Sequence, residues 1–201
     1  MKPTIGRIFK DGLFKNNPVF AQVLGICSTL AVTNVVKNTL FMCAGVIFAL
    51  SLSTMTISFM RNIIPSRVRM MVETLVMAVY VIIVDIMLKA YFPEISVTLG
   101  PYVGLIITNC ILMGRIEAFG ISNPPHVAFI DGVSAGLGYS YVLITIAFVR
   151  ELLGSGTIWG IHVLGSSWTN WSLMVMAGGA FFVLAVFIWV VKGLILKEEA
   201  K

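Results

Sequence analysis

Three cysteines are the residues of this chain best suited to metal chemistry, and their places in the sequence differ. Cys43 lies in a smooth apolar run, where a cysteine usually serves as a small buried hydrophobic residue. Cys27 and Cys110 lie in two apolar stretches that glycine and small polar residues interrupt. Thiolates are soft ligands that suit zinc or iron–sulfur centres. We therefore predict a metal site at Cys27 and Cys110 and a packing role for Cys43.

Two thiolates are half of the usual ligand set of an iron–sulfur cluster, which is four. The two histidines, His126 and His162, lie in expected loops and offer no ligand to these segments. A disulfide does not suit a position deep in the membrane and near the cytoplasmic side. Either the chain dimerises or a partner donates two more cysteines. Short helices beginning near Cys27 and Cys110 would direct their positive N-terminal ends toward an anionic thiolate centre.

The composition indicates a membrane protein. Of 201 residues, 58% are hydrophobic and only 11% are charged, and the mean hydropathy is +0.97. A soluble domain is typically about a quarter charged. These values exclude a nucleic-acid-binding protein, a secreted disulfide scaffold and an ordinary soluble enzyme, and they leave a polytopic membrane protein. Residues 1–17 are charged and polar, so we expect no cleavable signal peptide.

The segments that must position the cysteines are apolar and six in number. A spanning helix takes about 20 apolar residues. The first segment has a small and polar middle, and the fourth is short, with about 14 residues. We expect an all-α membrane protein with six transmembrane helices, the first and fourth being short or broken. The segments are residues 18–36, 39–60, 70–88, 101–114, 132–149 and 171–191.

The basic residues orient these segments. Of 14 lysines and arginines, 11 fall on one set of alternating sides and 3 on the other. Cytoplasmic loops carry the excess of such residues. We therefore expect both termini in the cytoplasm, which requires an even number of crossings and agrees with six.

The two halves of the chain echo each other. Residues 30–34 (LAVTN) and 105–109 (LIITN) are similar at a spacing of 75, and residues 59–66 and 148–155 are similar at a spacing of 89. We expect one membrane domain, residues 1–201, made of two inverted three-helix repeats, roughly 18–92 and 100–196. Paired broken segments in inverted repeats indicate a binding site at the midplane. Broken backbone persists there only where protein or ligand satisfies its polar groups.

Small and polar residues form the expected surroundings of the metal centre. The polar ones should satisfy broken backbone rather than contact metal-bound sulfur. Arg115 and Glu117, after the second cysteine segment, would tune or gate the centre or anchor their helix at the membrane interface. The expected surrounding residues are Gly25, Thr33, Asn34, Thr108 and Asn109.

Four long and unusual motifs carry a family resemblance: residues 24–33 (LGICSTLAVT), 105–119 (LIITNCILMGRIEAF), 61–66 (RNIIPS) and 149–156 (VRELLGSG). They resemble the paired D and E membrane subunits of the Na⁺-translocating NADH:quinone oxidoreductase. The likeness runs from residue 17 to residue 189. Residues 123–125 (NPP) and 131–139 (DGVSAGLGY) look more like the D subunit than like its relative, the E subunit of the Rnf complex.

The resemblance implies a multi-pass subunit of the bacterial inner (plasma) membrane without a complete active site of its own. In this family, the D and E subunits have six helices each in two inverted halves and opposite orientations. They share one [2Fe–2S] cluster, with two cysteines from each. Carried over to this chain, the cluster ligands are Cys27 and Cys110.

The resemblance also implies partners and cofactors. The cluster would relay electrons from the NADH-oxidising F subunit, with its FAD and iron–sulfur centre, to the covalent FMN of the C subunit on the periplasmic side. Electrons would then reach the FMN and riboflavin of the B subunit and finally ubiquinone, coupled to sodium transport. The A subunit completes the complex, and membrane lipid surrounds it.

Acidic residues inside membrane segments are functional candidates by default. For Glu73 we expect a pair with Arg69 or Arg67 on one helix face, and for Asp85 a pair with Lys89 at the favourable i,i+4 spacing. For Asp131, which precedes a glycine-rich stretch, we expect helix contact through small residues. A sodium path through any of the three acids is the alternative.

Two other functions stay open. An inverted-repeat transporter with its site at the broken helices would explain everything except the placed cysteine pair. The E subunit of an Rnf-type ferredoxin:NAD oxidoreductase would use the same two cysteines.

Overall fold

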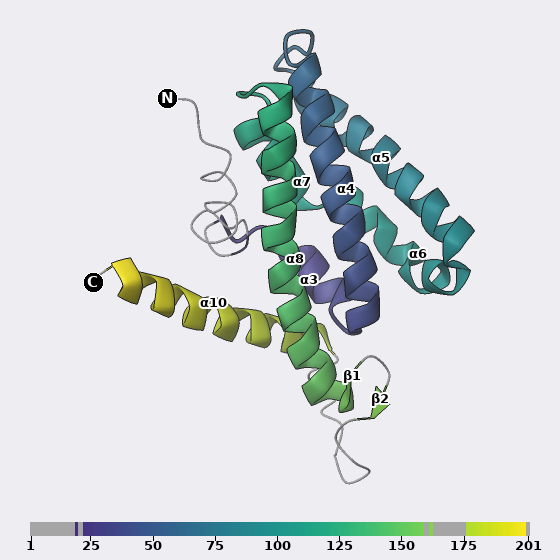
Figure 1. Cartoon of the computed structure of the whole chain (residues 1–201), viewed down its shortest axis with the longest axis vertical. Helices are drawn as coiled ribbons and strands as arrows, with labels where there is room; N and C mark the ends of the chain where they lie inside the picture. Colours follow the sequence, from purple (N-terminus) through teal and green to yellow (C-terminus); the bar gives the residue numbers. More distant parts are fainter. Residues whose placement is uncertain (1–18, 20–21, 159–160, 163–175, 200–201) are drawn as a thin grey trace.

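The computed structural model describes residues 19, 22–158, 161–162 and 176–199. This part of the chain is helical, apart from strands β1 (Thr157–Ile158) and β2 (Ile161–His162), which pair antiparallel (Figure 1). The helices are α3 (Ile26–Val32), α4 (Val36–Met60), α5 (Arg69–Tyr91), α6 (Pro93–Ile107), α7 (Cys110–Arg115), the π-helix η2 (Ile116–Gly120), α8 (Pro125–Ser155) and α10 (Ala177–Glu199).

Four described helical stretches are long and apolar enough to cross a membrane: α4, α5, the run Pro93–Gly120 and α8. They coincide with the second to fifth of the six expected segments. Of the first segment, the structure describes the seven-residue α3. The last corresponds to α10, whose apolar stretch, Gly178–Gly193, is shorter than a full span. The N-terminal basic residues and residues 163–175 lie outside the described residues.

The fourth segment begins earlier than the sequence suggested. We expected it to start at Pro101, as an apolar stretch of about 14 residues. Helix α6 instead starts at Pro93. A proline is tolerated at the first helical position, because a backbone N–H there would have no partner within the helix. Pro101 lies inside α6 on an exposed face. The segment is therefore a long helix broken near its middle.

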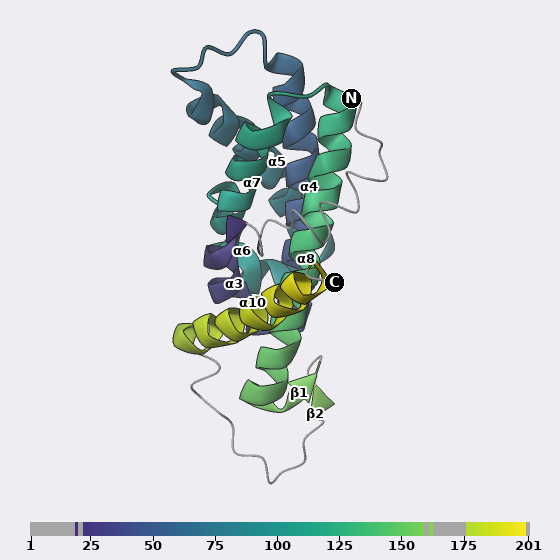
Figure 2. The same ribbon diagram turned by 90° about the vertical axis from the view of Figure 1, so that its left-hand side faces the viewer.

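Helices α4 and α8 form the centre of the molecule and run antiparallel, side by side (Figure 1). At one end Val36 N–H donates to Glu151 Oε2 at 2.6 Å, and at the other Ser58 Oγ donates to the Asn123 carbonyl at 2.5 Å. Figure 2 shows α10 crossing this pair steeply. The antiparallel pair is the frame on which the shorter helices are placed.

Small residues let α4 and α8 approach closely, as expected for the glycine-rich stretch after Asp131. A methyl group on Gly132 would lie 2.9 Å from Ser51 Cα, and one on Gly136 would lie 3.2 Å from Ile47 Cα. Both contacts are with the backbone of α4, which cannot turn away as a flexible side chain could. The two glycines therefore set the distance between the helices.

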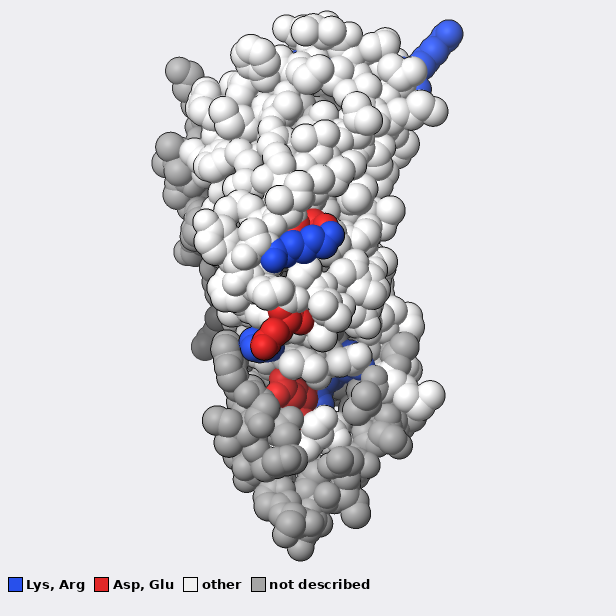
Figure 3. All heavy atoms as spheres, turned by 90° about the vertical axis from the view of Figure 1, so that its right-hand side faces the viewer, with Lys and Arg blue, Asp and Glu red and all other residues white. Residues whose placement is uncertain are grey.

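The outward side of α5 is apolar. Large exposed hydrophobic residues recur along it, among them Met71, Leu75, Ile82 and Ile86. Uncharged side chains cover most of the face of the molecule that lies on this side (Figure 3). A surface of this kind suits lipid or another membrane protein.

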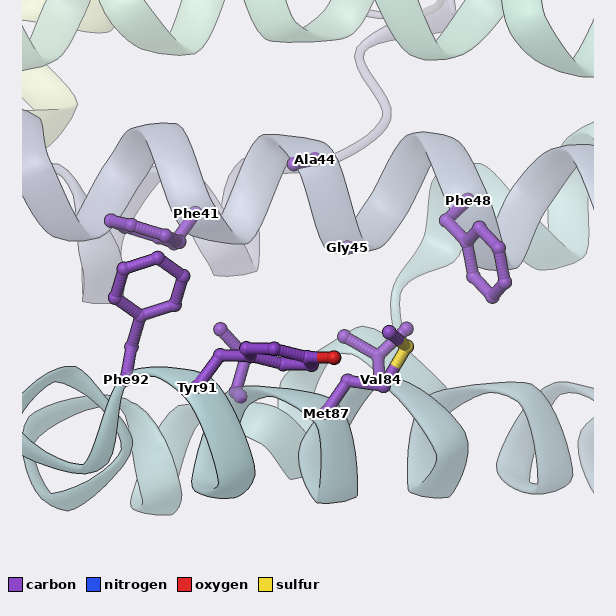
Figure 4. A pocket seen from close by; sticks show the side chains of 9 residues that line it. Phe41, Ala44, Gly45, Phe48, Val84, Met87, Tyr91 and Phe92 are labelled. Carbon is purple, nitrogen blue, oxygen red and sulfur yellow. The ribbon is translucent and has the colours of Figure 1, made fainter.

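A pocket of about 270 Å³ lies between α4 and α5. Its walls are apolar, and the rings of Phe41 and Phe92 meet at one end with centroids 5.2 Å apart (Figure 4). Val84 and Met87 of α5 line it opposite Phe48 of α4 (Figure 4). Apart from the Tyr91 hydroxyl, the lining side chains offer a ligand hydrophobic contact.

The close packing at Gly132 predicts the effect of a single methyl group. Gly132→Ala should destabilise the protein by about 1–3 kcal/mol, because overpacking must shift the backbone of α4. The control is Gly193→Ala in α10, where an added methyl group meets nothing within 4 Å. That change should leave stability equal or raise it by up to about 1 kcal/mol. Thermal unfolding in detergent checks both variants, and equal midpoints for the two would contradict the packing.

Candidate functional site

Both predicted cysteine segments contain a break in the helix. Gly25 precedes α3 with a left-handed backbone, φ 86°, and Cys27 is the second residue of the helix. Helix α6 ends at Ile107 and α7 begins at Cys110. Each cysteine therefore lies in the first turn of a short helix, directly after irregular backbone.

The structure brings the two cysteines together although 83 residues separate them in the sequence. The Cys27 and Cys110 side chains lie close enough to interact. Cys110 Sγ also accepts a hydrogen bond from Gly25 N–H at 2.9 Å. The two predicted thiols thus lie together, and Gly25 is in direct contact with one of them.

Exposure separates the third cysteine from this pair. Cys43 is buried in α4, whereas Cys27 is exposed and Cys110 is half-buried. The paired thiols can thus be reached from outside the chain. Among the described residues no group of three or more His, Cys, Asp or Glu side chains could hold a metal ion. Two thiols are what the described part of the chain offers at this place.

The polar residues around the cysteines mostly satisfy backbone, as expected. Thr33 Oγ1 donates to the Thr29 carbonyl, and Thr108 Oγ1 donates to the Gly104 carbonyl at 3.3 Å. Asn109 caps α7, because its Oδ1 accepts from Ile111 N–H at 3.3 Å. These bonds replace some of those that the helix breaks remove.

Asn34 is the exception among the expected surroundings, since it is exposed between α3 and α4. Two other residues lie at the site: Ser28, from the first interrupted segment, and Tyr139, which the sequence did not assign to the site. Ser28 and Tyr139 are fully buried and hydrogen-bonded to each other. The sequence signal for this contact is a tyrosine among the small residues of a long apolar helix. A buried tyrosine hydroxyl needs a hydrogen-bond partner, so a polar neighbour could have been predicted.

Comparison with known proteins shows which family the chain belongs to. The profile of a family described as "Rnf-Nqr subunit, membrane protein" matches residues 5–188. The chain belongs to this family. The resemblance expected from the cysteine motifs is therefore confirmed at the level of the family.

Relatives in the Rnf-Nqr family are similar over most of their length. The chain is 44% identical over 196 residues to the D subunit of the Na(+)-translocating NADH-quinone reductase of Pseudomonas aeruginosa strain LESB58, covering 95% of this chain and 88% of that protein. It is 45% identical over 190 residues to the corresponding D subunit of Yersinia enterocolitica, covering 92% and 91%. These relatives are named as subunits of an oxidoreductase complex.

A buried ion pair lies just beyond the second cysteine helix of this Rnf-Nqr chain. The Arg115 guanidinium donates to both carboxylate oxygens of Asp131, through Nε at 3.1 Å and through a second nitrogen. Both side chains are more than nine-tenths buried, and the guanidinium lies 5.8 Å from the centroid of the Phe119 ring. Arg115 is therefore bound to another helix inside the protein. It ties α7 to α8.

Among the described residues the expected helix-face pair of Glu73 with Arg69 or Arg67 does not form a salt bridge. Arg69 instead donates to Glu117 Oε1 at 2.9 Å, because η2 brings Glu117 over the start of α5. Glu73 is 1% exposed and interacts with both Glu117 and Arg69. Its Oε1 has no hydrogen-bond partner among the described residues. Local helix spacing could not show this, since Glu117 arrives from a distant segment.

Other charges hold helix ends together. Lys89 donates to Asp85 at 2.6 Å, which confirms the expected i,i+4 pair. Glu151 accepts from the first N–H of α4, at Val36, where the helix dipole favours a carboxylate. Arg150 donates to Thr33 Oγ1 at 2.5 Å, next to the end of α3. The end of α8 is thus fixed to the connection between α3 and α4.

The burial of Arg115 and Asp131 predicts an asymmetric response to mutation. Arg115→Met leaves the Asp131 carboxylate buried without its partner, which should cost about 3–5 kcal/mol. Adding Asp131→Asn in the same chain removes that charge and should recover part of the loss. Lys89→Met, at a pair whose lysine is 63% exposed, should cost about 0–1 kcal/mol. Thermal unfolding of the four proteins measures this, and a loss at Arg115 no larger than at Lys89 would refute the buried pair.

Proposed function

We propose that this chain is a D-type membrane subunit of a Na⁺-translocating NADH:quinone oxidoreductase and that Cys27 and Cys110 hold half of a [2Fe–2S] cluster. The other two ligands would come from the homologous E subunit. One observation carries the proposal: two helix breaks, far apart in the sequence, present their thiols to each other. A purely structural pair of cysteines has no need of two broken helices.

The residues present fit such a cluster. Its usual ligands are four cysteine thiolates, and two thiols lie together here. The Gly25 N–H donates to Cys110 Sγ, and N–H donors to sulfur stabilise the anionic form of a ligand. Cys27 is exposed, which leaves access for ligands from a second subunit.

When bound, the cluster would supply one-electron relay between the NADH-oxidising F subunit and the FMN of the C subunit. This chain would hold the cluster in position and would not itself convert a substrate. Its helix breaks would place the two thiols, and its polar side chains would bond the backbone groups left free at the breaks. Helix α8 contacts both breaks through Tyr139. NADH, FAD, the FMN groups and riboflavin would remain on other subunits. Quinone reduction and sodium transport would belong to the complex with the A and B subunits.

The arrangement supports two inverted halves. Helices α3 and α7 each begin at a break with a cysteine, and each is followed by a long helix, α4 or α8. Those two long helices run antiparallel, as halves of opposite orientation require. We infer six crossings, repeats roughly at 18–92 and 100–196, and both termini in the cytoplasm.

The relatives named above favour this function over the Rnf-type alternative, since both are D subunits of the NADH-quinone reductase. The thiol contact also argues against an inverted-repeat transporter, because transport of an ion or solute does not need two adjacent cysteines.

Substitution of single cysteines tests the proposal. Cys27→Ala and Cys110→Ala should each abolish the EPR signal of the reduced cluster, lower the iron content of the purified complex and remove NADH-to-quinone activity, because each removes one ligand of four. The matched control is Cys43→Ala, which lies in α4 and should leave all three measurements unchanged. An unchanged signal with unchanged activity in the Cys27 or Cys110 variant would refute the cluster assignment.

A further inference from the structure

Tyr139 joins the two cysteine segments from a third helix. It lies in α8 and is completely buried. Its hydroxyl meets Ser28 Oγ and also accepts a hydrogen bond from Asn109 Nδ2 at 3.3 Å. Ser28 directly follows Cys27, and Asn109 directly precedes Cys110. One phenol group therefore contacts the neighbour of each thiol-bearing residue.

The donors and acceptors of this network can be assigned. Ser28 Oγ donates its single hydrogen to the Gly25 carbonyl at 3.0 Å, so it must accept from the Tyr139 hydroxyl. Asn109 Oδ1 accepts from the backbone at Ile111, which turns the amide nitrogen toward the two hydroxyl groups. That nitrogen donates to Ser28 Oγ at 3.4 Å and to Tyr139. The Ser28 and Tyr139 hydroxyl groups thus each donate one hydrogen bond and accept at least one.

The ring of Tyr139 supports the same place by contact. A methyl group on Gly25 would lie 2.6 Å from Tyr139 Cε2, so the backbone of Gly25 lies directly against the ring. Gly25 is the residue whose N–H bonds Cys110 Sγ. Tyr139 therefore influences the position of Cys110 in two ways: its hydroxyl bonds Asn109, and its ring packs against Gly25.

We propose that Tyr139 is a positioning residue that sets the distance between the Cys27 and Cys110 thiols. It does so by hydrogen-bonding Ser28 and Asn109 together and by supporting Gly25. Helix α8 packs closely against α4 at its glycines, so Tyr139 projects from a fixed frame onto two helices of only seven and six residues. The consequence for electron transfer rests on the proposed function, but the spacing of the thiols does not.

The spacing is tested on the full-length chain without any cluster. In a Cys43→Ala background, diamide takes two electrons and two protons from a pair of thiols, and the rate at which Cys27 and Cys110 form a disulfide reports how closely they are held. Tyr139→Phe removes only the hydroxyl and should slow this reaction roughly fivefold, the change expected from one ordinary hydrogen bond. Ser28→Ala removes the acceptor of that bond and should slow it similarly.

The matched control is Tyr141→Phe, two residues further along α8, where the side chain is 59% exposed. In this variant the disulfide between Cys27 and Cys110 should form at the same rate as in the chain with Tyr139 and Tyr141 unchanged. Thermal unfolding of each variant shows whether the fold is kept. Oxidation of both Tyr139→Phe and Ser28→Ala at the unsubstituted rate would overturn the proposal, as would equal slowing in the Tyr141 control.

A second arm uses the assembled complex. Tyr139→Phe should retain iron but shift the EPR g-values and the midpoint potential of the cluster, whereas Tyr141→Phe should shift neither. Identical spectra and potentials for Tyr139→Phe and the unsubstituted complex would count against Tyr139. Absence of an iron signal from the unsubstituted complex would instead refute the proposed function, and the oxidation rates would still decide the role of Tyr139.

Discussion

The need to satisfy broken backbone inside an apolar protein governs this structure. A helix that stops within a membrane leaves N–H and carbonyl groups that water cannot reach, and each unsatisfied group costs several kcal/mol. Here side chains fill the gaps: Thr29 and Ser28 bond the Gly25 carbonyl, Asn109 caps α7, and Cys110 sulfur accepts the Gly25 N–H. The groups that repair the breaks are therefore the ones that hold the thiols in place.

The same constraint applies to charge. A chain with 11% charged residues places several of its charges where helices from different segments meet. Arg115 and Asp131 join α7 to α8, and Glu151 and Arg150 bond the start of α4 and the side chain of Thr33. Buried charges persist only when paired and hydrogen-bonded. The charges thus act as fixed joints between long helices and the short helices that carry the cysteines.

Close packing completes the frame. Gly132 and Gly136 bring α8 against the backbone of α4, and the antiparallel pair then holds Tyr139 at the level where α3 and α7 begin. In a lipid environment helices associate through such small-residue contacts and hydrogen bonds rather than through the hydrophobic effect. The rigid pair positions two helices of seven and six residues that would not be stable alone.

The sequence by itself determined the membrane class, the spans of α4, α5 and α8, and the two interrupted segments, because hydropathy and local interruption are properties of neighbouring residues. It also predicted that Cys27 and Cys110 share a site, because they lie in the matching interrupted segments of the two halves. It also determined the Asp85–Lys89 pair, which one helix turn brings together. Only the tertiary structure decided that Arg115 meets Asp131, that Arg69 meets Glu117 and that Tyr139 lies between Ser28 and Asn109. Those partners are brought together by helices from distant segments, and their contacts depend on the distance and register at which α8 and α5 pack, which no local pattern encodes.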